Sequence, residues 1–183
     1  LVLLIASLKF TYQIKPVSAR TIKVPQDYST IQWAVDNATA GDSIQVSSGI
    51  YYENVVISTS VTITGSNPAN TIVDGKGINS VFRLNSSQIT LSGFTIRNAG
   101  NSHTAIDIQK DLLVNDYHTV KNNVIMNSSS GIIIAGSHNN IILNNTFIGN
   151  PVRGIYNKVG TSNNIKGNSM QGSAYSRQLA SDT

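Results

Sequence analysis

The chain has 183 residues, a formal net charge of +4 and no cysteine, so disulfides and thiolate metal sites are excluded. Its basic residues are scattered rather than clustered among aromatic residues, which argues against nucleic acid as a partner. Short runs of Val and Ile alternate with Gly, Ser, Thr and Asn, a composition typical of many short strands joined by turns. The length suits a single domain with a sizeable core.

The N-terminal segment, residues 1–19, indicates export. Leu1–Leu8 is an almost purely apolar run that is too short to span a bilayer, and Val17-Ser18-Ala19 fits a signal-peptidase site. No Met or basic segment precedes Leu1, so we expect residues 1–19 to be a truncated signal peptide, with a short membrane anchor as the alternative. After cleavage the protein is expected to be secreted, at the cell surface or in the periplasm, and not integral to a membrane.

A first short strand over Thr21–Pro25 is followed by a predicted helix at about residues 29–38. Ser29 is the expected N-cap, and Gln32 three residues later completes a capping-box pattern. Apolar residues recur on one helix face, namely Ile31, Ala34, Val35 and Ala38. A solenoid exposes its core at the first coil and needs a cap there. We therefore expect this helix to be the cap, with Trp33 partly covering the open end.

Beyond the helix, most apolar runs are three residues long with apolar residues at both outer positions. Examples are Val61-Thr62-Ile63, Phe82-Arg83-Leu84 and Ile106-Asp107-Ile108. This period-two alternation predicts strands with one face toward a core and the middle residue facing outward. The pattern therefore predicts an all-β fold.

Three Asn residues, Asn123, Asn145 and Asn168, recur at nearly equal spacing, each with an aliphatic residue three positions before it. A period in the low twenties carried by short strands is a signature of a solenoid, so we interpret each period as one coil of a single-stranded right-handed parallel β-helix. Stacked coils lie about 4.8 Å apart. The three amides are expected to form a hydrogen-bonded column, at corners where Asn tolerates a left-handed backbone. Phe94 stands where the column would otherwise continue.

The coil before Asn123 is the longest. The segment from Phe94 to Asn123 exceeds the one from Asn123 to Asn145, and we place the surplus in a loop at Gln109–His118. We expect the β-helix to span residues 20–173, and residues 174–183 to be a frayed tail or the start of missing coils. Because an uncapped parallel edge promotes aggregation, further coils or another subunit are expected to cover the C-terminal end.

The stretch TIKVPQDYSTIQWAVDNATAGDSIQVSSGIYYENVVISTSVTITGS, with IVDGKG, ITLSGFTIRNAG and NNIILNNTFIGN, resembles the pectin lyase-like superfamily. The likeness covers about Thr21–Ser173 and is greatest to right-handed β-helix repeat proteins labelled NosD-like, found among bacterial and archaeal surface and periplasmic proteins. It implies the fold, but the superfamily includes lyases, hydrolases, esterases, adhesins and surface-layer components. The NosD label implies a copper role, which would need a cluster of His and Met.

The opening also resembles pectin methylesterases, in YSTIQWAV and in Gly49-Ile50-Tyr51-Tyr52-Glu53. Those enzymes carry their Asp, Arg and Gln side chains on motifs of the Gln-Asp-Thr and Asp-Phe-Ile-Phe-Gly type, which are absent from this sequence. The Asn-Thr-Asp and Gly-His-Gly motifs of polygalacturonases are absent too. We interpret Glu53 as a surface residue at a coil corner.

One expected strand stack places Arg83, Asp107, Ile133 and Tyr156 on its outer face. In carbohydrate-active members of the superfamily, such an outer wall forms the substrate groove. We therefore hypothesise a sugar-binding strip in which Asp107 lies beside Arg83 and Tyr156 is a stacking platform. In an enzyme, Asp107 and Arg83 would be the catalytic candidates. The alternative is an ordinary half-polar wall with a surface ion pair of little energetic consequence.

The long coil also collects residues suited to binding a divalent ion or to acid–base work, namely His103, Asp107, Asp111, Asp116 and His118. Their spacing matches no ligand motif. We therefore predict no metal site and no cofactor, with Ca²⁺ as the alternative.

The sequence as a whole predicts a secreted or cell-surface β-helix with a structural or polysaccharide-binding role and no catalysis. The expected partner is a polysaccharide or another glycan of the cell envelope. The alternatives are a polysaccharide-degrading lyase, hydrolase or pectinesterase-like enzyme, and a periplasmic copper accessory protein of NosD type.

Overall fold

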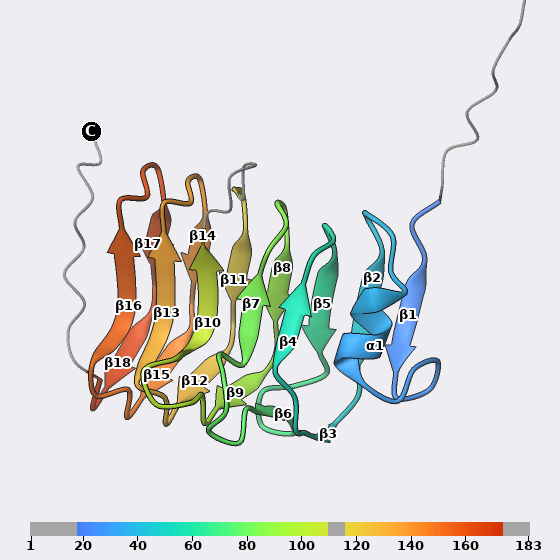
Figure 1. Ribbon diagram of the computed structural model, residues 1–183, viewed down its shortest axis with the longest axis horizontal. Helices are drawn as coiled ribbons and strands as arrows, with labels where there is room; N and C mark the ends of the chain where they lie inside the picture. Colours follow the sequence, from blue (N-terminus) through green and yellow to red (C-terminus); the bar gives the residue numbers. More distant parts are fainter. Residues whose placement is uncertain (1–17, 110–115, 174–183) are drawn as a thin grey trace, which may run out of the picture.

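The computed structural model describes residues 18–109 and 116–173. Most of the expected signal peptide (1–19), residues 110–115 of the expected loop and the expected tail (174–183) lie outside the described residues. Over the described part, the chain winds as an all-β, right-handed parallel β-helix in which successive coils add strands to three parallel sheets (Figure 1). The fold class expected from the sequence is confirmed.

The three sheets contain seven, six and five strands among the described residues, and each is named here by that number. The seven-stranded sheet consists of β1 (Thr21–Val24), β2 (Ser43–Val46), β5 (Thr62–Gly65), β8 (Thr90–Ser92), β11 (Thr119–Lys121), β14 (Ile141–Leu143) and β17 (Asn164–Lys166). The six-stranded sheet consists of β3 (Gly49–Tyr51), β6 (Thr71–Asp74), β9 (Thr95–Arg97), β12 (Val124–Met126), β15 (Thr146–Ile148) and β18 (Ser169–Gln171). The five-stranded sheet consists of β4 (Val55–Ile57), β7 (Phe82–Leu84), β10 (Thr104–Gln109), β13 (Ser130–Ala135) and β16 (Arg153–Lys158).

Side-chain alternation explains why three-residue runs suffice for most of these strands. In β7, Phe82 and Leu84 are fully buried while Arg83 between them faces outward. Inward-facing side chains of successive coils stack into one core along the solenoid. Full burial of one such Phe or Leu side chain contributes about 1.5–3 kcal/mol.

Buried amide and hydroxyl side chains form columns at the coil corners. Nδ2 of Asn123 donates to Oδ1 of Asn145 at 3.1 Å, and Nδ2 of Asn145 donates to Oδ1 of Asn168 at 3.1 Å. The column ends at Phe94, whose backbone N–H donates to Oδ1 of Asn123 at 3.0 Å. Two further columns, which sequence reasoning missed, contain His118, Asn140 and Asn163, and Ser128, Asn150 and Ser173.

The residue before each column position, rather than the column residue itself, adopts the left-handed backbone. In the first column, the preceding residues are Gly93, Asn122, Asn144 and Gly167, with φ of 81°, 56°, 54° and 67°. Gly and Asn tolerate this conformation better than other residues do. The expectation that the column Asn residues themselves take it was therefore wrong.

Helix α1 (Ile31–Asp36) is shorter than the expected helix at 29–38, and its N-cap is Thr30 instead of Ser29. The Thr30 hydroxyl accepts from the backbone N–H of Trp33 at 3.1 Å. Gln32 does not complete a capping box, because its amide bonds across to the backbone N–H and C=O of Val56 in β4.

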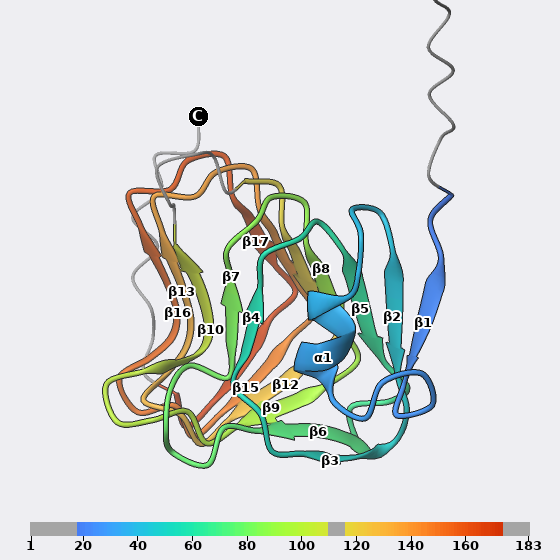
Figure 2. The same ribbon diagram turned by 45° about the vertical axis from the view of Figure 1, so that its right-hand side comes forward.

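The apolar face of α1 closes the first coil. Ile31, Ala34 and Val35 are buried in the core, and α1 lies over β1, β2 and β4 at one end of the solenoid (Figure 2). Trp33 is 54% exposed and meets the ring of Tyr28 edge-on at a centroid distance of 5.4 Å. The cap therefore depends on the aliphatic residues more than on the indole.

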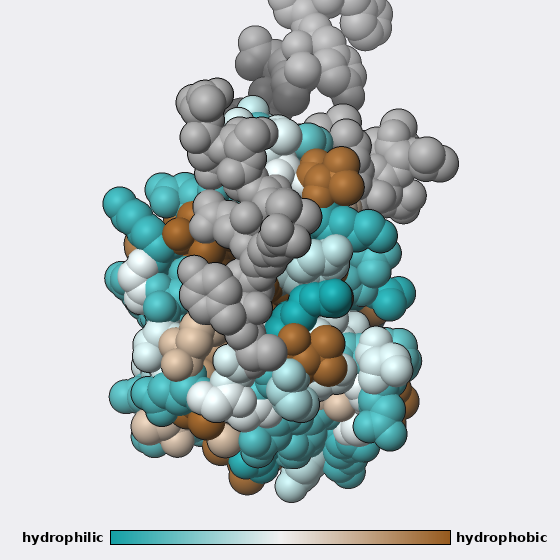
Figure 3. All heavy atoms as spheres, turned by 90° about the vertical axis from the view of Figure 1, so that its left-hand side faces the viewer, coloured by the Kyte–Doolittle hydropathy of each residue, from teal (hydrophilic) through white to brown (hydrophobic). Residues whose placement is uncertain are grey.

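The opposite end of the solenoid carries the outermost strands β16, β17 and β18. On the visible part of this end, small clusters of hydrophobic residues are separated by polar residues (Figure 3). The covering of this edge by further coils or another subunit stays a prediction.

Candidate functional site on the five-stranded sheet

The parallel register of the five-stranded sheet brings the predicted strip residues into one outward-facing column. Val56 pairs with Arg83, Arg83 with Asp107, Asp107 with Ile133, and Ile133 with Tyr156. We name these five residues the outer column. Since neighbouring strands lie about 4.8 Å apart, Arg83 and Tyr156 are separated by about 14 Å along the solenoid.

Asp107 is less accessible than the sequence suggested, with only 4% of its surface exposed. Its Oδ2 lies 3.4 Å from Nε of Arg83 and accepts from Nε2 of Gln109 at 3.0 Å. Its Oδ1 is buried and has no hydrogen-bond partner among the described residues. The carboxylate lies on the outward face of its strand, beside Arg83, and the neighbouring guanidinium and amide contact it. A ligand reaches this carboxylate only if those two side chains move.

Tyr156 is half-buried, and its ring is partly covered. The guanidinium carbon of Arg153 lies 4.0 Å from the ring centroid, within the range of a cation–π interaction. One ring face is therefore occupied by a cation, and a sugar would stack on the other face or bind both groups together.

A hollow of about 140 Å³ lies at the N-terminal end of the outer column, lined by Asn54, Val56, Asn79, Ser80 and Arg83. Nδ2 of Asn54 donates to the backbone carbonyls of Asn79 at 3.4 Å and Ser80 at 3.1 Å. These hydrogen bonds hold the Asn54 side chain in place as one wall of the hollow.

A second cation–aromatic pair joins the segments that follow the paired strands β3 and β6. Lys76 places Nζ 4.2 Å from the ring centroid of Tyr52, and Tyr52 is 57% exposed. Sequence reasoning missed Lys76 and Arg153, because each meets its ring only through the folded backbone.

Two carboxyl groups with lowered pKa lie away from the outer column. Burial alone raises the pKa of Asp74, but hydrogen bonds from the Lys76 backbone N–H and the Arg97 and Asn98 side chains hold it below its usual value. Burial likewise raises the pKa of Asp42, and donors from Arg20 and Thr39 outweigh that effect and lower it. Both carboxylates tie together neighbouring coils or turns, so their roles are structural.

The residues proposed for metal binding do not converge. His103 precedes β10 and His118 follows it in the coil, so the six-residue strand, about 20 Å long, separates them. His118 is fully buried at the end of an amide column. Oδ1 of Asp116 accepts from the backbone N–H of His138 at 2.6 Å. Asp111 lies outside the described residues.

No group of three or more His, Cys, Asp or Glu residues suited to a metal ion occurs in the described ranges. All three His and both Met residues of the chain fall within those ranges. Nδ1 of His138 is engaged by Thr161, accepting from its backbone N–H at 3.1 Å. Both Met residues lie on the six-stranded sheet, Met126 in β12 and Met170 in β18, where Met170 packs against the core.

Similar solved structures are pectin methylesterases. A pectin methylesterase mutant in complex with a hexasaccharide has a TM-score of 0.56 and 13% identity, over 91% of this chain and 68% of that chain. Pectin methylesterase PemA from Erwinia chrysanthemi has a TM-score of 0.55 and 11% identity over the same shares. These identities support a common fold alone.

Two sequence comparisons bear on the family. No curated protein matches the chain significantly. A family model described as "Periplasmic copper-binding protein (NosD)" matches residues 35–180. Because that match spans most of the chain, the protein belongs to the NosD family.

Proposed function

We propose that this protein is a polysaccharide-binding β-helix of the cell envelope that acts by contact rather than by catalysis. The observation that carries the proposal is the outer column, in which Arg83, Asp107 and Tyr156 lie in register on one straight sheet face. The column runs along the solenoid axis, so it suits an elongated ligand.

The chemistry of this face supports a glycan as the ligand. The hydroxyl groups of a sugar can accept from Arg83 and from Arg153, and its C–H faces can pack on Tyr156 or on Ile133. Each hydrogen bond contributes only about 0.5–1.5 kcal/mol net. Repetition of weak contacts along one chain of sugars raises the overall affinity, which a rigid wall of stacked strands favours.

The similar structures supply indirect support. One of the pectin methylesterases was solved with a hexasaccharide, so a β-helix of comparable shape can hold an oligosaccharide. At 13% identity, this likeness speaks for a suitable fold rather than for the same ligand.

The composition of the column favours binding over hydrolysis. Glycoside hydrolysis uses two carboxyl groups about 5–9 Å apart, and Asp107 is the one carboxylate among the five residues of the outer column. Its Oδ2 is engaged by Arg83 and Gln109. We therefore assign Asp107 the role of orienting Arg83.

Copper does not fit the side chains of this chain, although the family description includes it. A copper site needs several imidazole, thiolate or thioether ligands around one point. His118 and His138 share one corner of the solenoid, His103 lies at another, and both Met residues lie on the six-stranded sheet, while the chain has no Cys. His118 is fully buried, and no His and Met ligands gather around one point in the described residues.

Export to the periplasm or cell surface is part of the proposal. The family is described as periplasmic, and the signal-peptide pattern of residues 1–19 points the same way. Among the described residues, no helix has both the length and the apolar character needed to cross a membrane.

A glycan array probed with the chain from residue 20 onward tests this function. We expect binding to at least one envelope polysaccharide, weakened about twofold to tenfold by Tyr156→Ala, since an aromatic contact contributes about 0.5–1.5 kcal/mol. Asp107→Ala should weaken binding severalfold by releasing Arg83. Tyr117→Asn removes an exposed tyrosine outside the column and should change nothing. Absence of binding across the array, or equal binding by all variants, would contradict the proposal.

A further inference from the structure

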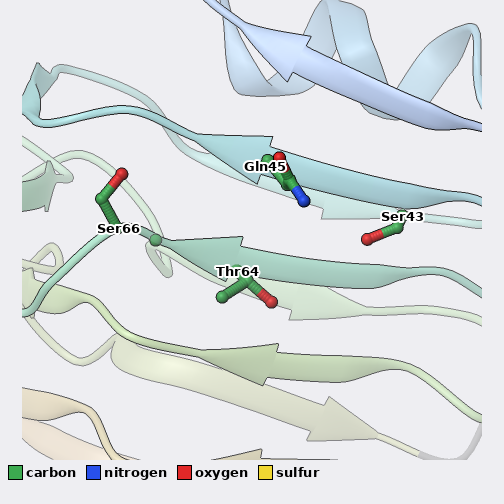
Figure 4. A pocket seen from close by; sticks show the side chains of 5 residues that line it. Ser43, Gln45, Thr64 and Ser66 are labelled. Carbon is green, nitrogen blue, oxygen red and sulfur yellow. The ribbon is translucent and has the colours of Figure 1, made fainter.

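A second hollow lies on the seven-stranded sheet, away from the outer column. It has a volume of about 330 Å³ and is lined by Ser43, Gln45, Thr64, Gly65 and Ser66 (Figure 4). Ser43 and Gln45 belong to β2, and Thr64 and Gly65 to β5, which pairs with it in register. A volume of this size is at the lower end of the range for small-ligand sites.

The polar groups around this hollow are largely unused by the protein. In the described part of the chain, neither the Ser43 hydroxyl nor the Gln45 amide makes a side-chain hydrogen bond, whereas Oγ of Ser66 donates to the carbonyl of Val46 at 3.0 Å. Oγ1 of Thr64 lies 3.5 Å from Oγ of Ser92, a long contact that leaves most of its bonding capacity open. The hollow therefore offers donors and acceptors to a ligand.

The lining carries no charge. A side-chain amide and hydroxyl groups both donate and accept, which matches a ligand whose groups do the same. Sugar hydroxyls have this property, whereas a carboxylate or phosphate only accepts. Lys23 on β1 pairs with Gln45 in register but does not line the hollow, and the methyl group of Thr64 gives a small apolar contact.

The sheet extends the same chemistry along the solenoid. Hydroxyl residues follow one another in register on the outward face, namely Thr21, Ser43, Thr62, Thr90 and Thr119. A ligand seated in the hollow can therefore continue across neighbouring coils.

We propose that this hollow is a binding site for an uncharged polysaccharide segment. The Gln45 amide pairs with adjacent sugar hydroxyls, and Ser43 and Thr64 hold the sugar from either side. The site lies on a different sheet from the outer column, so its test is independent of the function proposed above.

The test is a titration of the isotope-labelled chain, from residue 20 onward, with uncharged and charged hexasaccharides, followed by amide NMR shifts. Cellohexaose, maltohexaose and xylohexaose are the uncharged probes, and hexagalacturonate is the charged one. We expect at least one uncharged probe to shift the amides of Ser43, Gln45 and Thr64. Gln45→Ala and Thr64→Val should each raise its dissociation constant about fivefold to tenfold.

Thr146→Val is the matched control, because Thr146 faces outward on the six-stranded sheet, away from the hollow and its row of hydroxyl residues. It should leave the dissociation constant unchanged. The proposal is overturned if no uncharged probe shifts the β2 and β5 amides, if only hexagalacturonate does so, or if Thr64→Val and Thr146→Val have equal effects. Shifts confined to the five-stranded sheet would overturn it while supporting the outer column.

Discussion

At the scale of single residues, each coil corner is built from a pair of neighbours with different tasks. The first residue takes a left-handed backbone, as Asn144 does with φ of 54°, and the second, Asn145, buries its amide in the column. The turn aims the second side chain inward, where its donors and acceptors meet those of the next coil. Without this pairing, a polar corner inside the stack would cost about 1–3 kcal/mol per unsatisfied group.

Asn145→Ala should destabilise the protein by about 3 kcal/mol, because buried groups that bond to Asn145 lose their partner. Oδ1 of Asn145 accepts from both nitrogens of Asn123, and its Nδ2 donates to the carbonyl of Val120 at 2.9 Å. Urea unfolding measures the change. Asn164→Ala removes an exposed Asn from β17 and should stay within about 0.5 kcal/mol. Equal losses in the two variants would mean that the column contributes nothing.

The first amide column could be predicted from the sequence because Asn recurs there at equal spacing. The other two could not, because Ser128 and Ser173 stand at the ends of one and His118 at the end of another. Hydroxyl and amide side chains can replace one another in such positions, and His118 joins its column through its backbone N–H. The residue type therefore does not recur at a fixed spacing, although the corner geometry does. The burial of Asp107 was also unpredictable, because it depends on where Arg83 and Gln109 place their side chains.

At the scale of elements, helix α1 depends on a residue from a later coil. Oε1 and Oε2 of Glu53 accept from the backbone N–H groups of Ile31 and Gln32, each at 2.9 Å. A carboxylate is favourable at a helix N-terminus, where these amides lack partners within the helix. The interpretation of Glu53 as a plain surface residue missed this, since a contact between distant parts of the sequence leaves no local pattern.

Glu53→Ala should loosen the cap without unwinding the solenoid. We expect the amides of Ile31 and Gln32 to exchange with solvent faster, and the unfolding free energy to fall by about 1–2 kcal/mol, the usual consequence of losing a cap. Hydrogen exchange followed by NMR separates the two effects. Glu53→Gln keeps one acceptor oxygen and should show a smaller change. Unaltered protection at both amides in Glu53→Ala would contradict this role.

At the scale of the whole molecule, stacking turns a short sequence period into long, straight columns of side chains. Alternation and the Asn spacing were enough to predict the parallel β-helix, because they reflect the backbone geometry that every coil shares. They could not predict the ligand, because binding depends on the few outward positions where coils differ. Arg83, Asp107 and Tyr156 occupy such positions. Membership of the NosD family does not change which hydrogen bonds or stacking contacts these side chains can make.

Polysaccharide binding by the outer column is tested most directly by an NMR titration of the labelled chain. The ligand is the polysaccharide selected on the glycan array, and the amide shifts are mapped onto the strands. We predict that the shifts cluster on Arg83, Ile133 and Tyr156, in neighbouring strands of the five-stranded sheet. Saturation of binding with no shift in β7, β10, β13 or β16 would contradict the claim.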